Sequence, residues 1–358
     1  MRILFVTGRA HLPQSVGGVQ SSTDSTIRML ARRGHSCAVA CALWGGGAFA
    51  LKRRIAIWLS RSGYAIDRVN GYPTYRAWHP VDHIAAIARE FKADVVVVQH
   101  QDTVPFVRAL RNADLPCAVY LRNIEFDELG GDLRDLPADV RYIANSRFTS
   151  RTFGEAFGID AAVLPPLVDA DKYRTEQKGT RVTMVNPARE KGIDVALSLA
   201  EACPDVPFTI VEGWGLPEDA AARIAAIAEG ADNVLLLPRT NDMRAVYAQA
   251  RVVLAPSQWE EAWGRVASEA HVSGIPVLGS DRGGLPEAIG PGGLIVPHDA
   301  PIDDWKAALR SMWDDDERWQ ALSDAAKAYA LRPEMAEDGH VDILLSILEE
   351  TRAGTGIG

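Results

Sequence analysis

Two glutamates, Glu261 and Glu269, stand eight residues apart in PSQWEEAWGRVASEAHVSGIP, residues 256–276. Between them the chain is expected to run from a loop into a helix, whose start attracts anions through unpaired amides and the positive end of its dipole. A carboxylate beside a bound phosphate needs a neutral group in between, and sugar hydroxyls are neutral donors that carboxylates bind well. One glutamate on a ribose and one on a hexose would bracket a diphosphate, as in a nucleotide sugar. The alternative for Glu269 is the polar face of an ordinary helix.

Cations that could hold such a diphosphate follow a predicted strand in VNPAREKGID, residues 185–194. Lys191 offers a compact, mobile charge for a phosphate, whereas Arg189 can bind two oxygens at once. Arg239, in PRTND, follows another predicted strand. The alternative interpretation is that these are solvated loop cations.

Glycine pairs precede two predicted helices. Gly17 and Gly18 lie in SVGGVQSST, before a helix expected from about Ser21, and Gly284 lies in SDRGGLPEAIG. Paired glycines allow close approach of the backbone to an anion and offer it amide hydrogens. GGV lacks the full dinucleotide-binding fingerprint, so a tight turn is the other interpretation.

These residues need a scaffold, and short β-branched runs alternate with helical patterns throughout the chain. Such alternation is typical of parallel sheets covered on both faces, here in two doubly wound series separated near residues 165–180. In these sheets ligands bind beyond the carboxyl ends of the strands. We predict strands at 2–7, 36–43, 94–100, 117–122, 141–146, 161–165, 181–187, 207–213, 233–238, 251–257, 276–281 and 293–297, and helices at 21–34, 81–91, 303–330 and 335–353.

Composition narrows the class of protein. A net charge of −9 and a pI near 5.4 argue against a global attraction to nucleic acid. The four cysteines form no CxxC pair, which favours a reduced, cytoplasmic compartment, and Cys37 and Cys41 are expected on one buried strand face. We expect neither a signal peptide nor a spanning helix, since no apolar run approaches ~18 residues.

Several segments resemble the retaining glycosyltransferases of family 4. PSQWEEAWG, EAHVSGIPV, GGLPE and GGLIVP are similar to that family's donor-binding signature, and NSRFTSRTF and LPPLVD to its inter-domain region. The resemblance covers nearly the whole chain and is strongest over 142–297. It implies an α/β GT-B fold, two Rossmann-like doubly wound domains facing each other across a cleft. The domains would be 1–168 for the acceptor and 169–332 for the nucleotide sugar, with a helix at 333–358 returning to the first.

The resemblance also implies residue roles. Glu261 would bind the donor sugar, Glu269 the ribose and Lys191 the diphosphate, with backbone amides of Trp263, Gly264 and Arg265 near the sugar and phosphates. No metal and no cofactor are expected, and the co-substrate would be a UDP or GDP sugar. The implied activity is a hexosyl or related transfer in glycan, glycolipid or natural-product glycoside biosynthesis. The donor side as a whole would comprise Glu261, Lys191, Asn186, Glu269, Gly17, Gly18, Arg189, Arg239, Trp263, Gly264, Arg265 and Gly284.

Two positions depart from the family pattern. Asn186 stands where members carry a phosphate-binding arginine, which removes a charge from the leaving group; Arg189 or Arg239 is a candidate substitute. Arg122, in VYLRNIEF, replaces a histidine next to Asn123 and suggests an anionic acceptor or donor, or an ion pair with a neighbouring carboxylate. With His100, Arg122 and Asn123 form the expected acceptor side.

Residues 49–61, FALKRRIAIWLSR, allow two interpretations. On a helix, Leu51, Ile55, Trp58 and Leu59 share one face, which could touch the inner face of a membrane carrying a lipid-linked acceptor. The other interpretation, an ordinary helix packed on the first sheet, is preferred from sequence.

Three rivals to a transferase remain. A nucleotide-sugar epimerase would not be expected to carry the paired-glutamate block. A pseudo-glycosyltransferase that couples non-sugar groups would keep the diphosphate site. A non-catalytic nucleotide-sugar-binding protein would bind the donor without turnover.

Overall fold

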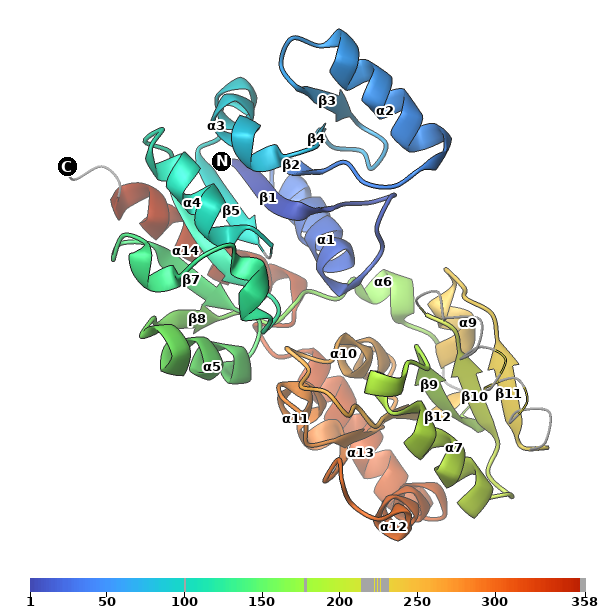
Figure 1. The fold of residues 1–358 in the computed structure, drawn as a ribbon. Helices are drawn as coiled ribbons and strands as arrows, with labels where there is room; N and C mark the ends of the chain where they lie inside the picture. Colours follow the sequence, from blue (N-terminus) through green and yellow to red (C-terminus); the bar gives the residue numbers. More distant parts are fainter. Residues whose placement is uncertain are drawn as a thin grey trace. The chain divides into compact units, whose positions relative to one another are not determined.

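The computed structural model describes residues 1–99, 101–176, 179–213, 222, 224, 226 and 232–354. The chain divides into two compact units (Figure 1). Unit 1 contains Met1–Leu167 and Pro333–Gly358, and unit 2 contains Val168–Arg332. Each unit is a parallel or nearly parallel sheet with helices on both faces, so the predicted doubly wound α/β class is confirmed.

Unit 1 is built on an eight-stranded sheet of order β3-β4-β2-β1-β5-β6-β7-β8, in which only the β3–β4 pair is antiparallel. The order reverses between β1 and β5, so the loops after these two strands diverge at the carboxyl edge. The elements are β1 Arg2–Ala10, α1 Gly18–Arg32, β2 Ser36–Ala42, α2 Gly47–Leu59, β3 Tyr64–Asp67, β4 Thr74–Ala77, α3 Pro80–Phe91, β5 Val95–Gln99, α4 Thr103–Arg111, β6 Cys117–Leu121, η1 Phe126–Leu129, η2 Leu133–Asp135, β7 Arg141–Ala144, α5 Arg147–Phe157, β8 Ala161–Val163 and α14 Glu337–Gly354.

Alternation along the strands explains the two cores of unit 1. Leu4 and Val6 of β1 pack in a cluster with apolar residues of α3, α4 and α5, whereas Ile3 and Phe5 pack on the other face with α1 and α14. Successive side chains of a strand point to opposite faces, so a continuous apolar run supplies both cores at once. The carboxy-terminal helix α14 thus completes the amino-terminal sheet, as the family resemblance implied.

Unit 2 is built on a six-stranded parallel sheet of order β11-β10-β9-β12-β13-β14. In chain order this is 3-2-1-4-5-6, with its switch point between β9 and β12. The elements are α6 Ala170–Tyr173, β9 Arg181–Val185, η3 Arg189–Lys191, α7 Ile193–Ala202, β10 Phe208–Val211, β11 Val234–Leu237, α9 Met243–Tyr247, β12 Ala250–Ala255, α10 Arg265–His271, β13 Val277–Ser280, α11 Leu285–Ile289, η4 Gly290–Gly292, β14 Gly293–Val296, α12 Ile302–Trp313 and α13 Asp316–Ala330.

Three local predictions were wrong. The first helix begins at Gly18 rather than near Ser21. The segment 303–330 is two helices, because the Asp315 side chain caps α13 by accepting from the Arg318 amide, 2.9 Å away. Strands β3 and β4 were missed because each has only four residues and a mixed polar sequence.

Candidate functional site

Two loops of unit 2 meet at the sheet's switch point and bring Lys191 to Glu261. Lys191 ends the short η3 turn after β9, and Glu261 lies in the loop after β12. The Lys191 Nζ donates to Glu261 Oε1 at 2.5 Å, and both side chains are mostly buried, 18% and 16% exposed. Gly192 makes this approach feasible, since it has φ +83° and a Cβ there would lie 1.9 Å from the Pro256 carbonyl oxygen. A cation and a carboxylate therefore share the position where sheets of this order bind ligands.

The backbone around Glu261 is fixed on both sides. Its carbonyl accepts from the Gly284 amide at 2.6 Å, and it forms a bridge with Gly283, whose φ is +60°. A side chain on Gly283 would place its Cβ 2.3 Å from the Glu261 carbonyl oxygen. Ser257 donates to Glu261 Oε1 at 2.9 Å. The glycine pair thus positions the loop of Glu261, which was not the role expected of it.

Lys191 also contacts an aromatic ring, because its Nζ lies 4.6 Å from the centre of the Trp259 ring. The amides of Gln258 and Trp259 donate to the Glu190 carbonyl, at 2.8 and 3.3 Å, and hold the two loops together. Beside them, a cavity of about 470 Å³ is lined by Arg189, Glu190, Gly192, Asp194, Val195 and Gln258.

Glu269 lies within α10, on the same unit. Its Oε1 accepts from the Arg265 guanidinium at 3.0 and 3.2 Å, and its Oε2 accepts from the Tyr247 hydroxyl at 3.0 Å. Burial opposes the charge of Arg265, but the Glu269 carboxylate outweighs it and raises the pKa of Arg265. Burial, followed by the Glu269 charge, raises the pKa of Tyr247 well above its usual range. Burial, followed by the Glu269 charge, also raises the pKa of Tyr173 to about 12, so Arg265, Tyr247 and Tyr173 all act on this carboxylate.

Two residues just before helix α10, Trp263 and Gly264, determine how the helix begins. Gly264 precedes the helix with φ +94°, and the buried Trp263 donates from Nε1 to Ser268 Oγ at 2.9 Å. The Trp263 ring is therefore part of the interior, and only its backbone was predicted to face a ligand.

Asn186 adopts a left-handed conformation, with φ +64°, directly after β9. Asparagine tolerates this region better than most residues. The Asn186 backbone amide donates to the Val211 carbonyl at 2.8 Å. A Cβ on Gly213 would lie 2.6 Å from the Asn186 Cβ, so the two residues are in close contact. Of the two candidate substitutes, the Arg189 side chain is 84% exposed and lies 3.6 Å from Asp194, while Arg239 is exposed beyond β11.

Unit 1 presents its own switch-point loop, residues 11–17, between β1 and α1. Gly17 is the residue before α1 and has extended backbone, so the helix start does not require a glycine there. Arg76, on β4 and fully buried, secures the other end of the loop by donating to the carbonyls of His11 at 3.4 Å and Leu12 at 2.5 Å. The same guanidinium donates to Asp67 Oδ2 at 2.7 Å.

Arg122 follows β6 at the carboxyl edge and is buried. It donates to Ser22 Oγ, to Thr23 Oγ1 at 3.2 Å and to Gln99 Oε1 at 2.9 Å, and its guanidinium stacks 4.5 Å from the Tyr120 ring centre. These contacts hold the Arg122 guanidinium in place at this edge of unit 1.

Two polar side chains near Arg122, Glu128 and Asp102, were not predicted from the sequence. Glu128 accepts from Asn123 Nδ2 at 3.0 Å and pairs with Arg9, and Asp102 precedes α4 with φ +63°. Burial, followed by the charge of Glu128, raises the pKa of Asp102. The sequence did contain one signal for Asp102, which is its position three residues after the end of strand β5. The predicted acceptor residue His100 lies outside the described residues.

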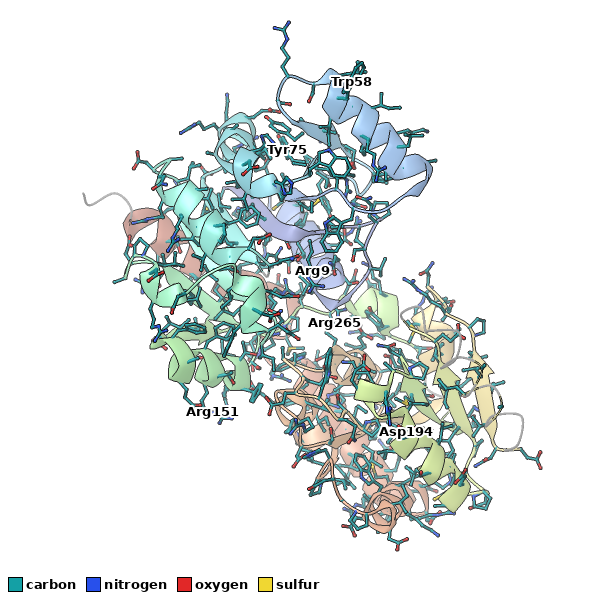
Figure 2. All side chains as sticks on the ribbon, viewed as in Figure 1. Arg9, Trp58, Tyr75, Arg151, Asp194 and Arg265 are labelled. Atoms are coloured by element: carbon teal, nitrogen blue, oxygen red, sulfur yellow. The ribbon has the colours of Figure 1, made fainter. Side chains whose placement is uncertain are left out.

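Helix α2 does not bury the apolar face that the sequence predicted for it. Figure 2 shows Trp58 near its end, and the exposed fractions of Leu51, Ile55, Trp58 and Leu59 are 57%, 49%, 83% and 69%. The preferred interpretation, a helix packed on the first sheet, is confirmed, because Ile57 packs with Leu43 and with Ala65 of β3. The packing uses Ile57 and the small Ala50, which are buried, and leaves the apolar face exposed.

Within the described ranges, no helix is both long and apolar enough to cross a membrane. No group of three or more His, Cys, Asp or Glu side chains is arranged to hold a metal ion in this part of the chain. The four cysteines are buried free thiols, and burial raises the pKa of Cys37 and Cys117 to about 12.

Family comparisons cover both units. Residues 16–172 match the family described as "Glycosyltransferase Family 4", and residues 170–329 match the family described as "Glycosyl transferases group 1". The two matches together span residues 16–329.

Individual relatives and structures agree with these matches. The chain is 42% identical over 100 residues to a D-inositol 3-phosphate glycosyltransferase of Corynebacterium kroppenstedtii, covering 27% of this chain and 22% of the relative. It is 30% identical over 253 residues to the Nocardia farcinica protein of that name, covering 61% and 56%. The chain thus spans about a fifth to about half the length of these relatives. The structure of Anabaena HepE in complex with UDP and glucose superposes with a TM-score of 0.75 at 18% identity, covering 97% of this chain and 99% of HepE.

Proposed function

Because the chain belongs to the GT-B glycosyltransferases of family 4, we propose that it moves a sugar from a nucleotide-diphosphate sugar to an acceptor hydroxyl, with retained configuration and without a metal. The observation that carries the proposal is the Lys191–Glu261 pair at the switch point of unit 2. Such a pair offers a cation to a diphosphate and a carboxylate to sugar hydroxyls within one small region.

The main chemical requirement is to stabilise the leaving diphosphate. As the bond from the anomeric carbon to the diphosphate oxygen breaks, negative charge grows on that oxygen and the sugar becomes oxocarbenium-like. We propose that Lys191 stabilises the leaving diphosphate, which is the kind of preorganised electrostatic contribution that dominates many enzymes. The acceptor oxygen forms the new bond on the same face, and its proton passes to the departing phosphate oxygen.

Glu261 and Glu269 are proposed to bind neutral hydroxyls of the donor. Two hydrogen bonds of Glu261 fall on Oε1, from Lys191 and Ser257, and Oε2 is proposed to accept from the transferred sugar. Glu269 is already held by Arg265 and Tyr247, which orient its carboxylate for the ribose. A uridine or guanosine diphosphate sugar is the proposed donor, supported by the similarity in fold to HepE, whose structure is a complex with UDP and glucose.

An anionic acceptor is proposed for unit 1. Support comes from Arg122, a buried guanidinium at the carboxyl edge of the sheet, and from relatives named for inositol 3-phosphate. Asn123 is proposed to bind an acceptor hydroxyl through the same amide that Glu128 now orients.

Donor binding is tested by thermal shift of the full chain with UDP, GDP, ADP, dTDP and their common sugar conjugates. A ligand at 100 times its Kd should stabilise the protein by about 2.7 kcal/mol. Glu269→Ala should lose this stabilisation, whereas Glu201→Ala, on the exposed side of α7, should keep it. Binding that survives unchanged in Glu269→Ala would remove its ribose role. Tight binding with no turnover against any acceptor would favour a nucleotide-sugar sensor over the transferase.

Peripheral membrane contact through α2 is also proposed. Exposed large apolar side chains concentrate between residues 44 and 78: Trp44, Leu51, Ile55, Trp58, Leu59, Ile66, Val69 and Trp78. A concentration of exposed large apolar side chains commonly marks an interaction site.

The membrane proposal is tested by flotation with phosphatidylglycerol and phosphatidylcholine vesicles. Trp58→Ser/Leu59→Ser should reduce binding to the anionic vesicles several-fold without lowering thermal stability, since both side chains are exposed. Leu331→Ser, at a 69% exposed apolar site in unit 2, is the control. Equal vesicle binding by all three proteins would end the membrane proposal.

A further inference from the structure

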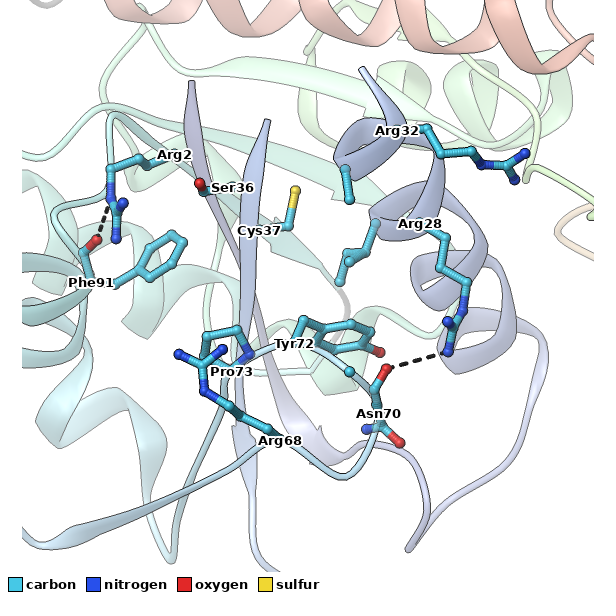
Figure 3. A pocket seen from close by; sticks show the side chains of 13 residues that line it. Arg2, Arg28, Arg32, Ser36, Cys37, Arg68, Asn70, Tyr72, Pro73 and Phe91 are labelled. Carbon is cyan, nitrogen blue, oxygen red and sulfur yellow. Dashed lines mark hydrogen bonds between the residues drawn. The ribbon is translucent and has the colours of Figure 1, made fainter. Parts of the chain in front are cut away.

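The largest described cavity lies in unit 1 and contains none of the predicted donor or acceptor residues. It measures about 770 Å³ and opens between the second half of α1 and the loop that leads into β4 (Figure 3). Arg2 and Ser36, at the beginnings of β1 and β2, help to line it. The cavity therefore lies at the amino edge of the parallel sheet, opposite the carboxyl edge where the chemistry is proposed.

Four of the cavity's lining residues are arginines, and none is an aspartate or glutamate. The arginines are Arg2, Arg28, Arg32 and Arg68. Their concentration is unexpected in a chain whose net charge is −9. A concave surface lined by charges of one sign raises the local concentration of opposite charge.

Two of the arginines are held in position from the cavity wall. Arg2 Nε donates to the Phe91 carbonyl at 2.6 Å, and Arg28 donates to Asp24 Oδ2 at 2.9 Å and to the Asn70 carbonyl at 3.3 Å. In Figure 3 the Arg68 side chain lies beside Pro73, on the opposite side of Tyr72 from Arg28. Burial, followed by the charge of Glu90, raises the pKa of Tyr75, and the charges of Arg2 and Arg68 both oppose this rise, so they act on the same region of unit 1.

Carboxylates near the cavity lie outside its lining. Asp24 pairs with Arg28, Glu337 lies 3.5 Å from Arg32, and Asp94 Oδ2 accepts from the Arg2 backbone amide at 2.7 Å. Glu90 accepts from the Tyr64 hydroxyl at 2.5 Å, and the carboxyl end of α1 contributes a partial negative charge of roughly one half. The charged side chains that line the cavity itself are the four arginines.

The remaining lining is apolar or aromatic. Ile27, Cys37, Tyr72 and Phe91 are buried, and together with Pro73 they form an apolar wall. A cavity that joins an apolar wall to guanidinium groups suits a ligand that is itself divided in this way, because arginine binds phosphate oxygens in pairs.

We propose that this cavity is a second anion site, which binds a phosphate ester carrying a ring or an apolar chain. The phosphate would lie against Arg28 and the apolar part against Tyr72 and Pro73, and Arg68 would add its positive charge from the other side of Tyr72. A soluble phosphate ester and the headgroup of a phospholipid share this chemistry. The site is separate from the diphosphate site proposed for Lys191, and it does not depend on the transferase proposal.

The probe is phenyl phosphate, titrated calorimetrically into the full chain carrying Lys191→Ala, so that the proposed donor site does not contribute. Adding Arg28→Gln and Arg68→Gln should weaken binding at least tenfold. Adding Arg108→Gln and Arg151→Gln, which removes the same charge from exposed arginines of unit 1, should leave binding unchanged. Thermal melting checks the fold, and Arg68→Gln alone, at an exposed position, should retain the native melting temperature and still weaken binding.

Flotation with phosphatidylglycerol vesicles distinguishes the two sources. Reduced flotation of the Arg28→Gln/Arg68→Gln protein identifies a lipid headgroup, and unchanged flotation with weakened phenyl phosphate binding identifies a soluble ester. Equal phenyl phosphate affinity in the cavity variant and the control variant would overturn the proposal, as would no measurable binding to the Lys191→Ala protein.

Discussion

The two units share one sheet architecture but place their charged residues differently. In unit 2, Lys191 and Glu261 pair across the switch point with side chains 18% and 16% exposed. In unit 1, Arg76 and Asp67 pair at 0% and 2% exposure, beneath the loop they secure. A partly exposed pair can exchange its partner for a ligand at modest cost, whereas a fully buried pair cannot separate without leaving an uncompensated charge.

The two ion pairs consist of similar groups but lie in different surroundings. Lys191 and Glu261 of unit 2 lie in short loops held by glycines, so this pair suits direct contact with a donor. The unit 1 pair is attached to strands β3 and β4 and donates to carbonyls of the loop before α1. Unit 1 therefore uses this buried ion pair for shape, whereas the pair in unit 2 is proposed to serve in binding.

The largest expected effect comes from breaking the buried pair. Arg76→Ala should lower the free energy of unfolding by about 3–5 kcal/mol, because Asp67 is left buried without its nearest cation. Arg33→Ala removes two surface ion pairs, with Asp338 and Asp342, and should lower stability far less, because solvent screens exposed pairs. Urea unfolding measures both. Equal losses would show that burial does not distinguish the two pairs.

A smaller effect, on rate, is expected in unit 2. Lys191→Ala should lower kcat by about 10²–10³-fold, since removing one preorganised group that stabilises a developing anion typically has this effect. Arg189→Ala should lower it less than tenfold because that side chain is 84% exposed. Steady-state kinetics with the identified donor and acceptor provides the measurement. If Arg189→Ala proves as damaging as Lys191→Ala, Arg189 substitutes for the arginine that Asn186 replaces.

The sequence predicted the sheet framework well, because each long strand is a continuous β-branched run bounded by turn residues. It failed at β3 and β4, where Asp67 and Arg76 are strand residues whose charges compensate each other. A pattern of polar residues cannot reveal a pair nine positions apart that is buried by the rest of the fold. The exposure of the apolar face of α2 could not be predicted, for the related reason that periodicity identifies a face and not what covers it.

The site was predicted unevenly. Lys191 and Glu261 are 70 residues apart, but both follow strands, so strand-end position was sufficient to suggest that they meet. The ion pair itself and the role of Gly283 could not be predicted, because they depend on how two loops cross. In unit 1, Glu128 lies on η1 and reaches the carboxyl edge only through loop geometry.

The smallest expected difference between the two units is in the stability that each loses at acid pH. Burial is the main cause that lowers the pKa of His11 and His340 in unit 1, and of His271 in unit 2, to about 4. An unfolded histidine has a pKa near 6.5, so the unfolded chain binds more protons below that value. The stability contributed by each buried neutral histidine is complete above pH 6.5 and is lost as the pH falls towards 4.

At pH 5.5 each buried histidine should therefore have lost about 1.4 kcal/mol, and unit 1, with two of them among its described residues, about twice as much as unit 2. Hydrogen exchange of core amides in β1 and β5 against β9 and β12, at pH 7.5 and 5.5 with intrinsic rates corrected, measures the two units separately. His340→Gln should halve the loss in unit 1 and make it equal to the loss in unit 2. An equal loss in both units of the unsubstituted protein would mean that unit 1 opens locally around His11 or His340 before its sheet does, and that its buried charges restrain the loop more weakly than the geometry implies.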